Sequence, residues 1–187
     1  MKNYFIVSLM AGSLILASVG CGGPKKVENQ KGVEEIEVPL SGREYQSNKE
    51  FYRAKSSGIS PDMATAKKIA LNNAKSEIAG LISSKIKTVT DNYTNQRSTA
   101  AAQDFENKFE SMTREVVNQQ LVDVAIIGEK ILKKGTSYEY WLAIEVSKQS
   151  ILDGISNTVS KDQKLQIDYD KKKFEEIYNS EMEKMAQ

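Results

Sequence analysis

Cysteine and histidine, which often act as nucleophiles, general bases and metal ligands, are almost missing from this chain of 187 residues. It has one cysteine, Cys21, and no histidine. Without an imidazole there is no Ser-His or Cys-His pair, and one cysteine makes neither an internal disulfide nor a cysteine metal cluster. Carboxylates are frequent, but no spacing singles out an acid-base pair. We therefore expect no enzymatic activity, no metal and no cofactor, and a single reactive position at Cys21.

The residues before Cys21 predict the fate of its thiol. Lys2 is followed by an uncharged run from Tyr4 to Gly20, which is typical of an export signal. The run is shorter than the roughly 20 residues that a membrane-spanning helix needs. Its end resembles a bacterial lipobox, in which the cysteine is linked to diacylglycerol and becomes the new N-terminus. The residues that carry this resemblance are Leu16, Ala17, Ser18, Val19, Gly20 and Cys21.

The lipobox match is incomplete at Ser18, because Leu, Val or Ile usually stands three residues before the cysteine. The alternative is ordinary signal cleavage after Gly20, which leaves Cys21 as a free thiol. We expect the lipid-anchored form, since the only cysteine lies at the one position that this modification requires. Fatty acyl chains such as palmitate, two or three per molecule, are enough for stable membrane attachment.

The charge of the chain favours attachment through lipid over attachment through basic residues. The sequence has 26 lysines and arginines and 25 acidic residues, and removal of residues 1–20 takes away only Lys2. A nearly neutral surface offers no general attraction for nucleic acid or anionic lipid headgroups. Gly22 is not acidic, as an inner-membrane retention signal would be. We therefore expect a protein anchored in the outer membrane and facing the periplasm.

Composition divides the chain into four parts. We expect a lipoprotein signal peptide over residues 1–20 and a lipid-anchored linker over 21–50, where little can be buried. A core domain is expected over 51–147 and a C-terminal helical extension over 148–187. The linker would hold the domain clear of the membrane.

The core domain reads as an α+β fold with a small antiparallel three-stranded sheet. A strand begins at Phe51, and Ser60-Pro61 then reads as an N-cap and first helical residue. The following helix is long enough to overhang the sheet or bend near Gly80. A second helix covers residues 105–121, and a strand hairpin follows it, with strict alternation over 138–146. The expected buried stripe of the long helix is Met63, Ala66, Ala70, Ala74, Ile78, Leu81, Ile82, Val89 and Tyr93.

Together these segments resemble a known family of envelope proteins. Phe51-Tyr52-Arg53-Ala54, Ser57-Gly58, the Ala-rich helix with Asn73-Ala74-Lys75, and the Tyr-rich hairpin are similar to the Lpp-twenty family of bacterial lipoproteins. They also resemble the N-terminal domain of flagellar assembly protein T. The resemblance covers roughly residues 41–147. It implies a strand-helix-strand-strand, dodecin-like domain in an envelope lipoprotein, and it brings no catalytic residues.

Three further side chains are candidates for ligand contacts. Asn73 lies beside the alanine stripe and either points into a cleft or hydrogen-bonds to a neighbouring strand end or loop. Together with Tyr140, Tyr138 and Trp141 form either an aromatic binding platform or part of a core, which is the usual place of strand aromatics.

The sequence favours two functions over a third, a hydrolase that would use carboxylates or a Ser-Lys pair in a chain without histidine. The first is a non-enzymatic envelope lipoprotein whose domain binds other envelope proteins, a second copy of itself or cell-wall material. The alternative is a carrier that holds a small apolar ligand or lipid between the long helix and the sheet, lined by the alanine stripe and Met63. A closed helix-sheet interface would count against the carrier.

Overall fold

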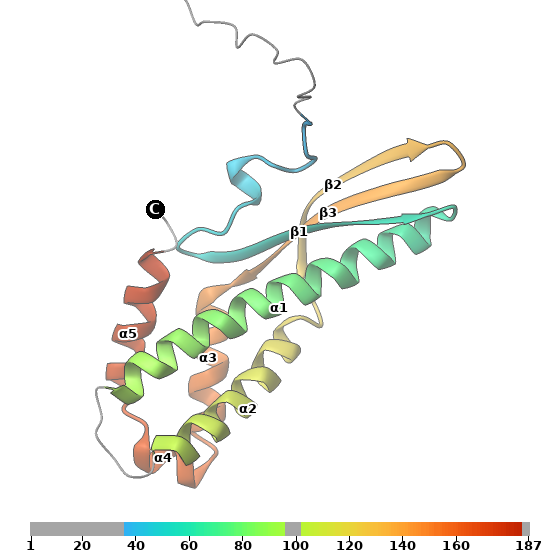
Figure 1. Cartoon of the computed structure of the whole chain (residues 1–187). Helices are drawn as coiled ribbons and strands as arrows, with labels where there is room; N and C mark the ends of the chain where they lie inside the picture. The colour runs from blue at the N-terminus through green and yellow to red at the C-terminus, as the bar shows by residue number, and fades with distance from the viewer. Residues whose placement is uncertain (1–35, 96–101, 185–187) are drawn as a thin grey trace, which may run out of the picture. The chain divides into compact units, whose positions relative to one another are not determined.

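The structure, a computed structural model, describes residues 36–95 and 102–184 (Figure 1). Residues Glu37–Gln187 form one compact unit. Its elements, in chain order, are the 3-10 turn η1 (Arg43–Tyr45), β1 (Phe51–Ser60), α1 (Met63–Asn95), α2 (Ala102–Gln120), β2 (Ala125–Lys134), β3 (Ser137–Ser147), α3 (Lys148–Val159), α4 (Gln163–Asp168) and α5 (Lys171–Glu183).

The three strands form one antiparallel sheet in the order β1-β3-β2, which confirms the α+β fold. The β2-β3 hairpin closes through Gly135 and Thr136, and Gly135 has a φ of 59°. A positive φ at the first position of a two-residue hairpin loop is where glycine is preferred. Tyr138, Tyr140 and Leu142, spaced by two along β3, all point to the face of the sheet that α1 covers, as their period predicts.

The long helix begins two residues later than expected. Asp62, not Ser60, is the N-cap, because its carboxylate accepts a hydrogen bond of 2.7 Å from the backbone N–H of Thr65. Ser60 instead receives a hydrogen bond from the backbone N–H of Asp62. Both residues are good caps, and Pro61 between them lies outside the helix, so the first turn starts at Met63.

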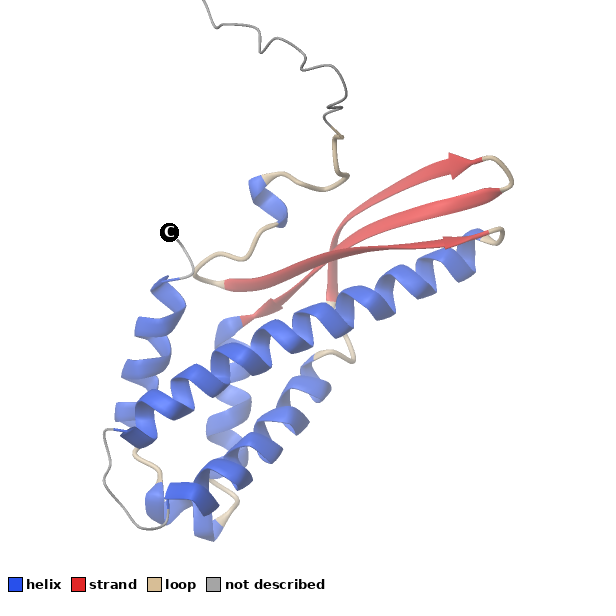
Figure 2. Ribbon diagram, viewed as in Figure 1, coloured by secondary structure: helices blue, strands red, loops and turns tan. Residues whose placement is uncertain are grey.

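The first half of α1 lies against β1 and β3 at very close range (Figure 2). Ala66, Ala70 and Ala74 are all 0% exposed. A Cβ added to Gly58 of β1 would lie 2.4 Å from the Ala66 carbonyl oxygen, which shows how closely the two backbones approach. The alanine stripe is thus the buried face, as predicted, while Met63 is an exception because it is 47% exposed.

The second half of α1 extends past the sheet, which confirms the expected overhang, and it packs on α2 and α5 (Figure 1). An aromatic cluster fills the space between these helices, with neighbouring ring centroids 5.2 to 6.5 Å apart. Its members are Tyr93, Phe105, Phe109, Tyr169, Phe174 and Tyr178. One continuous hydrophobic cluster joins them to the sheet. Residues 148–184 therefore belong to the core and are not an extension of it, a correction to the expected domain division.

The other face of the sheet is partly covered by the segment that precedes β1. The Nζ of Lys55 donates a 3.1 Å hydrogen bond to the carbonyl oxygen of Leu40, and the Tyr45 ring lies against Gly128 of β2. Ala143, at the centre of this face, is fully buried. The folded unit therefore begins near Glu37, earlier than the linker boundary at residue 50 that composition indicates.

Candidate functional site

Cys21, the signal peptide over 1–20 and the first half of the linker, residues 21–35, lie outside the described residues. Their assignment stays a prediction from the sequence. The described unit begins 16 residues after Cys21, at Glu37. An extended chain of that length spans at most about 55 Å.

Asn73 has a structural role in this fold. Its side-chain amide donates a 3.0 Å hydrogen bond to the carbonyl oxygen of Ser57, on the free edge of β1. This is the second of the two alternatives that the sequence left open for Asn73. The contact ties α1 to the edge strand and occupies a main-chain acceptor that would otherwise face solvent.

Tyr138 and Trp141 do not form a common platform. They lie three positions apart on β3, so their side chains point to opposite faces of the sheet. Tyr138 packs against the hydrophobic core on the α1 side. Trp141 lies half-buried on the other face, and its Nε1 is buried without a hydrogen-bond partner among the described residues. Of the two alternatives for these aromatic residues, a platform shared by Tyr138 and Trp141 does not form, because residues three positions apart on a strand face opposite sides of the sheet.

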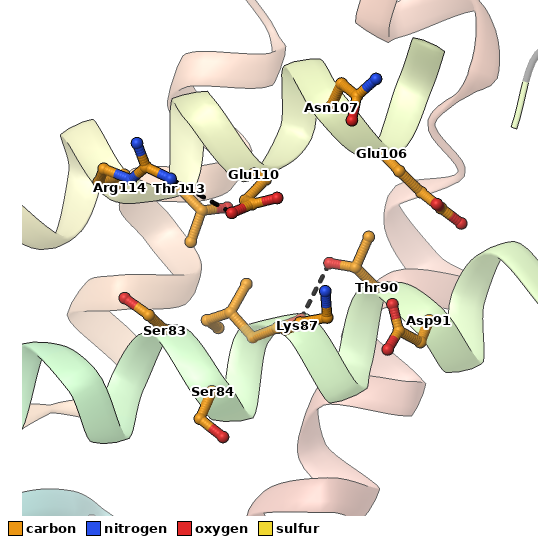
Figure 3. Close-up of a pocket in the computed structure, with 11 residues that line it drawn as sticks. Ser83, Ser84, Lys87, Thr90, Asp91, Glu106, Asn107, Glu110, Thr113 and Arg114 are labelled. Atoms are coloured by element: carbon orange, nitrogen blue, oxygen red, sulfur yellow. Dashed lines mark hydrogen bonds and ion pairs between the residues drawn. The ribbon is translucent and has the colours of Figure 1, made fainter. Parts of the chain in front are cut away.

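A polar groove of about 440 Å³ lies between α1 and α2 (Figure 3). Its volume falls within the range of small-molecule sites, about 300 to 1,000 Å³. Its floor is formed by buried Ile86, Thr90 and Thr113. We call this feature the α1–α2 groove, and its remaining lining residues are Ser83, Ser84, Lys87, Asp91, Glu106, Asn107, Glu110 and Arg114.

Charge is distributed unevenly along the α1–α2 groove. Asp91 and Glu106 lie at one end, and Arg114 lies at the other (Figure 3). Glu106 accepts a 2.8 Å hydrogen bond from the Thr94 hydroxyl, and Arg114 donates one of 3.2 Å to Glu110. Neither Asp91 nor Glu106 is in a salt bridge with a described cation. The groove therefore offers acceptors at one end and guanidinium donors at the other.

Thr113 is the least expected residue in the groove. It is 4% exposed, and its Oγ1 has no hydrogen-bond partner in the part of the chain that the structure describes. A buried hydroxyl without a partner costs free energy. Sequence reasoning missed it, since Thr113 stands among the apolar residues of α2. The available signal was the pair of polar rows spaced by four: Ser83, Lys87 and Asp91 on α1, and Glu106, Glu110 and Arg114 on α2.

A buried lysine lies at the start of α3, in contact with β1 and α5. Lys148 is 3% exposed, and its Nζ donates a 3.3 Å hydrogen bond to the Met182 carbonyl oxygen and lies 5.1 Å from the centre of the Tyr52 ring. The Tyr178 hydroxyl donates to the Lys148 carbonyl oxygen at 2.7 Å. Burial, with a smaller effect from Lys85, lowers the pKa of the Lys148 ammonium to about 8.

This burial predicts a distinct dependence of stability on pH. The pKa of Lys148 is near 10.4 in the unfolded chain and about 8 in the folded one. Between these values the unfolded state binds more protons, so the free energy of unfolding rises from about pH 8 upward. Burial also raises the pKa of Tyr52 to about 12. Above about pH 10 the unfolded chain therefore ionises first and stability falls again.

Urea denaturation from pH 7 to 11 should thus show a maximum of stability near pH 10. In Lys148→Met the rise between pH 8 and 10 should disappear, while the fall above pH 10 should stay. A flat profile in the wild type, or the same rise in the variant, would show that Lys148 is not the group responsible.

No cluster of three or more Cys, His, Asp or Glu side chains in residues 36–95 and 102–184 is arranged to hold a metal ion. Within the same residues no helix combines the length and apolar character needed to cross a membrane.

The fold and the groove define the chain as an α+β domain with a polar interhelical site. Comparison of the chain with protein-family models, with curated proteins and with solved structures found no match. The resemblance to the Lpp-twenty family therefore stays a prediction from the residues quoted above.

Proposed function

We propose that this chain is a non-enzymatic, lipid-anchored protein of the bacterial cell envelope, whose folded unit binds envelope proteins or cell-wall material. The observation that carries the proposal is the position of its only cysteine. Cys21 follows an uncharged run and small residues, and 15 mostly polar residues separate it from the folded unit that begins at Glu37. The anchor is placed in the outer membrane, with the domain facing the periplasm.

The structure supports this proposal through the self-contained core of the folded unit. The compact unit that begins at Glu37 has one continuous hydrophobic core, whose members all lie among the described residues. The α1–α2 groove provides this unit with a polar surface of ligand size. A tether followed by a self-sufficient domain is the arrangement that a membrane-held binding protein needs.

Replacing Cys21 tests the anchor directly. In bacteria that process lipoproteins, the wild-type chain should incorporate radioactive fatty acid and remain with membranes after a high-salt wash. Cys21→Ser should incorporate none and should yield a soluble, folded domain, because the thioether is the only attachment. An unlabelled wild type, or a variant that stays on washed membranes, would contradict the lipid anchor.

The packing of α1 argues against the alternative function, a carrier of small apolar ligands. That function needs space between α1 and the sheet, lined by the alanine stripe and Met63. The three alanines are fully buried against β1 and β3, and Met63 is 47% exposed. The geometry therefore favours the binding protein over the carrier.

Ala70→Leu and Ala74→Leu should each destabilise the fold, because three added carbons have no room where the backbones are nearest. Overpacking of this kind typically costs about 1 to 3 kcal/mol, which lowers the melting temperature by several degrees. Lys68→Leu, on the exposed side of α1, is the matched control and should change it little. If the leucine variants were more stable than the wild type, the interface would contain space and the carrier would be favoured.

A further inference from the structure

We propose that the α1–α2 groove binds a short peptide with free termini, about three residues long, with its ammonium group at Asp91 and Glu106 and its carboxylate at Arg114. This inference rests on the proposed function and deepens it, because it names the class of molecule that the envelope-facing domain binds. The length of the groove, the charges at its ends and the unpartnered Thr113 hydroxyl support it.

The length of the groove fits a tripeptide. Its lining on α1 extends from Ser83 to Asp91. Eight residues of α-helix rise about 12 Å, and three residues of extended peptide span about 10 Å. A free amino acid is too short to reach both charged ends, whereas a chain of many residues would have to leave the groove at one end.

The acidic end suits an ammonium group. Asp91 and Glu106 come from different helices and lie at the same end of the groove (Figure 3). Glu106 already accepts one hydrogen bond, from Thr94, which fixes its carboxylate while leaving its other oxygen available. No described cation forms a salt bridge with either residue, so a bound ammonium would supply the missing counter-charge with charge-assisted hydrogen bonds.

The opposite end suits a carboxylate. Arg114 uses one Nη for Glu110, at 3.2 Å, and its side chain is largely exposed. A guanidinium has five N–H donors in a planar fork that matches a carboxylate, so most of its donors remain for a ligand. Ser83 lines the same end from α1 and adds a hydroxyl.

Thr113 lies beside Arg114, at the arginine end of the groove, and points to a polar ligand. It projects from α2 toward α1 (Figure 3), and its buried Oγ1 has no partner among the described residues. A peptide group of the ligand, which carries both an N–H and a carbonyl, would satisfy this hydroxyl after rotation of the side chain. Because this hydroxyl makes no hydrogen bond among the described residues, we expect its removal to weaken ligand binding without destabilising the fold.

Isothermal titration of the full chain in detergent with trialanine tests the proposal. Trialanine has both termini free and no charged side chain, so binding reports the two ends of the groove. N-acetyl-trialanine and trialanine amide each lack one charge and should bind at least about tenfold more weakly. Asp91→Asn should weaken trialanine binding by a similar factor, and this variant should bind trialanine and N-acetyl-trialanine equally.

Thr113→Val separates a ligand contact from a structural role. It should weaken trialanine binding severalfold while the melting temperature stays the same or rises, because the hydroxyl makes no bond in the free protein. Thr88→Val, on the exposed side of α1, is the control and should leave binding unchanged.

Three results would overturn the inference. They are the absence of binding at millimolar trialanine, equal binding of the acetylated and amidated peptides, or full binding by Thr113→Val. If one of these results were obtained with a chain that is acylated at Cys21, the peptide-binding inference would fail while the lipid anchor would stand. Failure of the inference can thus be told apart from failure of the proposed function.

Discussion

Gly58→Ala is expected to lower the free energy of unfolding by about 3 kcal/mol or more. The new Cβ would lie 2.4 Å from the Ala66 carbonyl oxygen and 2.6 Å from the Ala70 backbone nitrogen. Both atoms belong to the backbone of α1, so no side-chain rotation relieves the clash, and the helix must move off the sheet. In a domain of this size the melting temperature should fall by about 6 to 12 °C.

Gly80→Ala is the matched control for Gly58→Ala. Gly80 is exposed in the middle of α1, and a Cβ there would meet nothing within 4 Å. Alanine is favoured over glycine in a helix interior by about 1 kcal/mol, so this variant should be more stable than the wild type. Thermal denaturation of both variants is the measurement. A harmless Gly58→Ala would mean that α1 does not lie on β1 as described.

Phe174→Ala is expected to cost about 3 to 5 kcal/mol, the usual range for a buried phenylalanine. Phe174 of α5 is 0% exposed, and its ring lies 5.2 Å from Phe109 of α2 and 5.7 Å from Tyr93 of α1. The side chain thus joins the last helix to the two that precede the hairpin. Chemical denaturation of the full chain should show one cooperative transition shifted to lower denaturant.

Phe51→Ala serves as the control for Phe174→Ala. Phe51 is only half-buried at the start of β1, so its replacement by alanine should lower the free energy of unfolding by distinctly less. If residues 148–184 were a separate extension, Phe174→Ala would leave the transition of the sheet and α1 in place. A second, unshifted transition in the denaturation curve would therefore contradict the single core.

The periodicity of the sequence predicts most of the fold. Alternation over 138–146 identifies β3, and alanines spaced by four identify the buried face of α1, because burial on one side imposes these periods. The domain boundaries were less predictable. The segment from Leu40 to Tyr45 looks polar enough for a linker, yet it packs on the sheet through one lysine contact and one aromatic ring. Such contacts leave no period in the sequence.

The candidate site was predicted only in part. The sequence allows Asn73 either a ligand contact or a structural hydrogen bond, and the hydrogen bond to Ser57 shows the structural role. Tyr138 and Trp141 share no platform, since residues three positions apart on a strand lie on opposite faces of the sheet. The α1–α2 groove was missed because it depends on how two helices pair, and the register of a helical hairpin is not set by the polarity of either helix alone.

The central claim is that Cys21 carries the anchor of this protein. The most direct measurement is mass spectrometry of the N-terminal peptide from the full chain, purified from bacterial membranes in detergent. The account predicts a peptide that begins at Cys21 and carries a thioether-linked diacylglycerol. An unmodified thiol at Cys21 in the membrane-derived protein would contradict it.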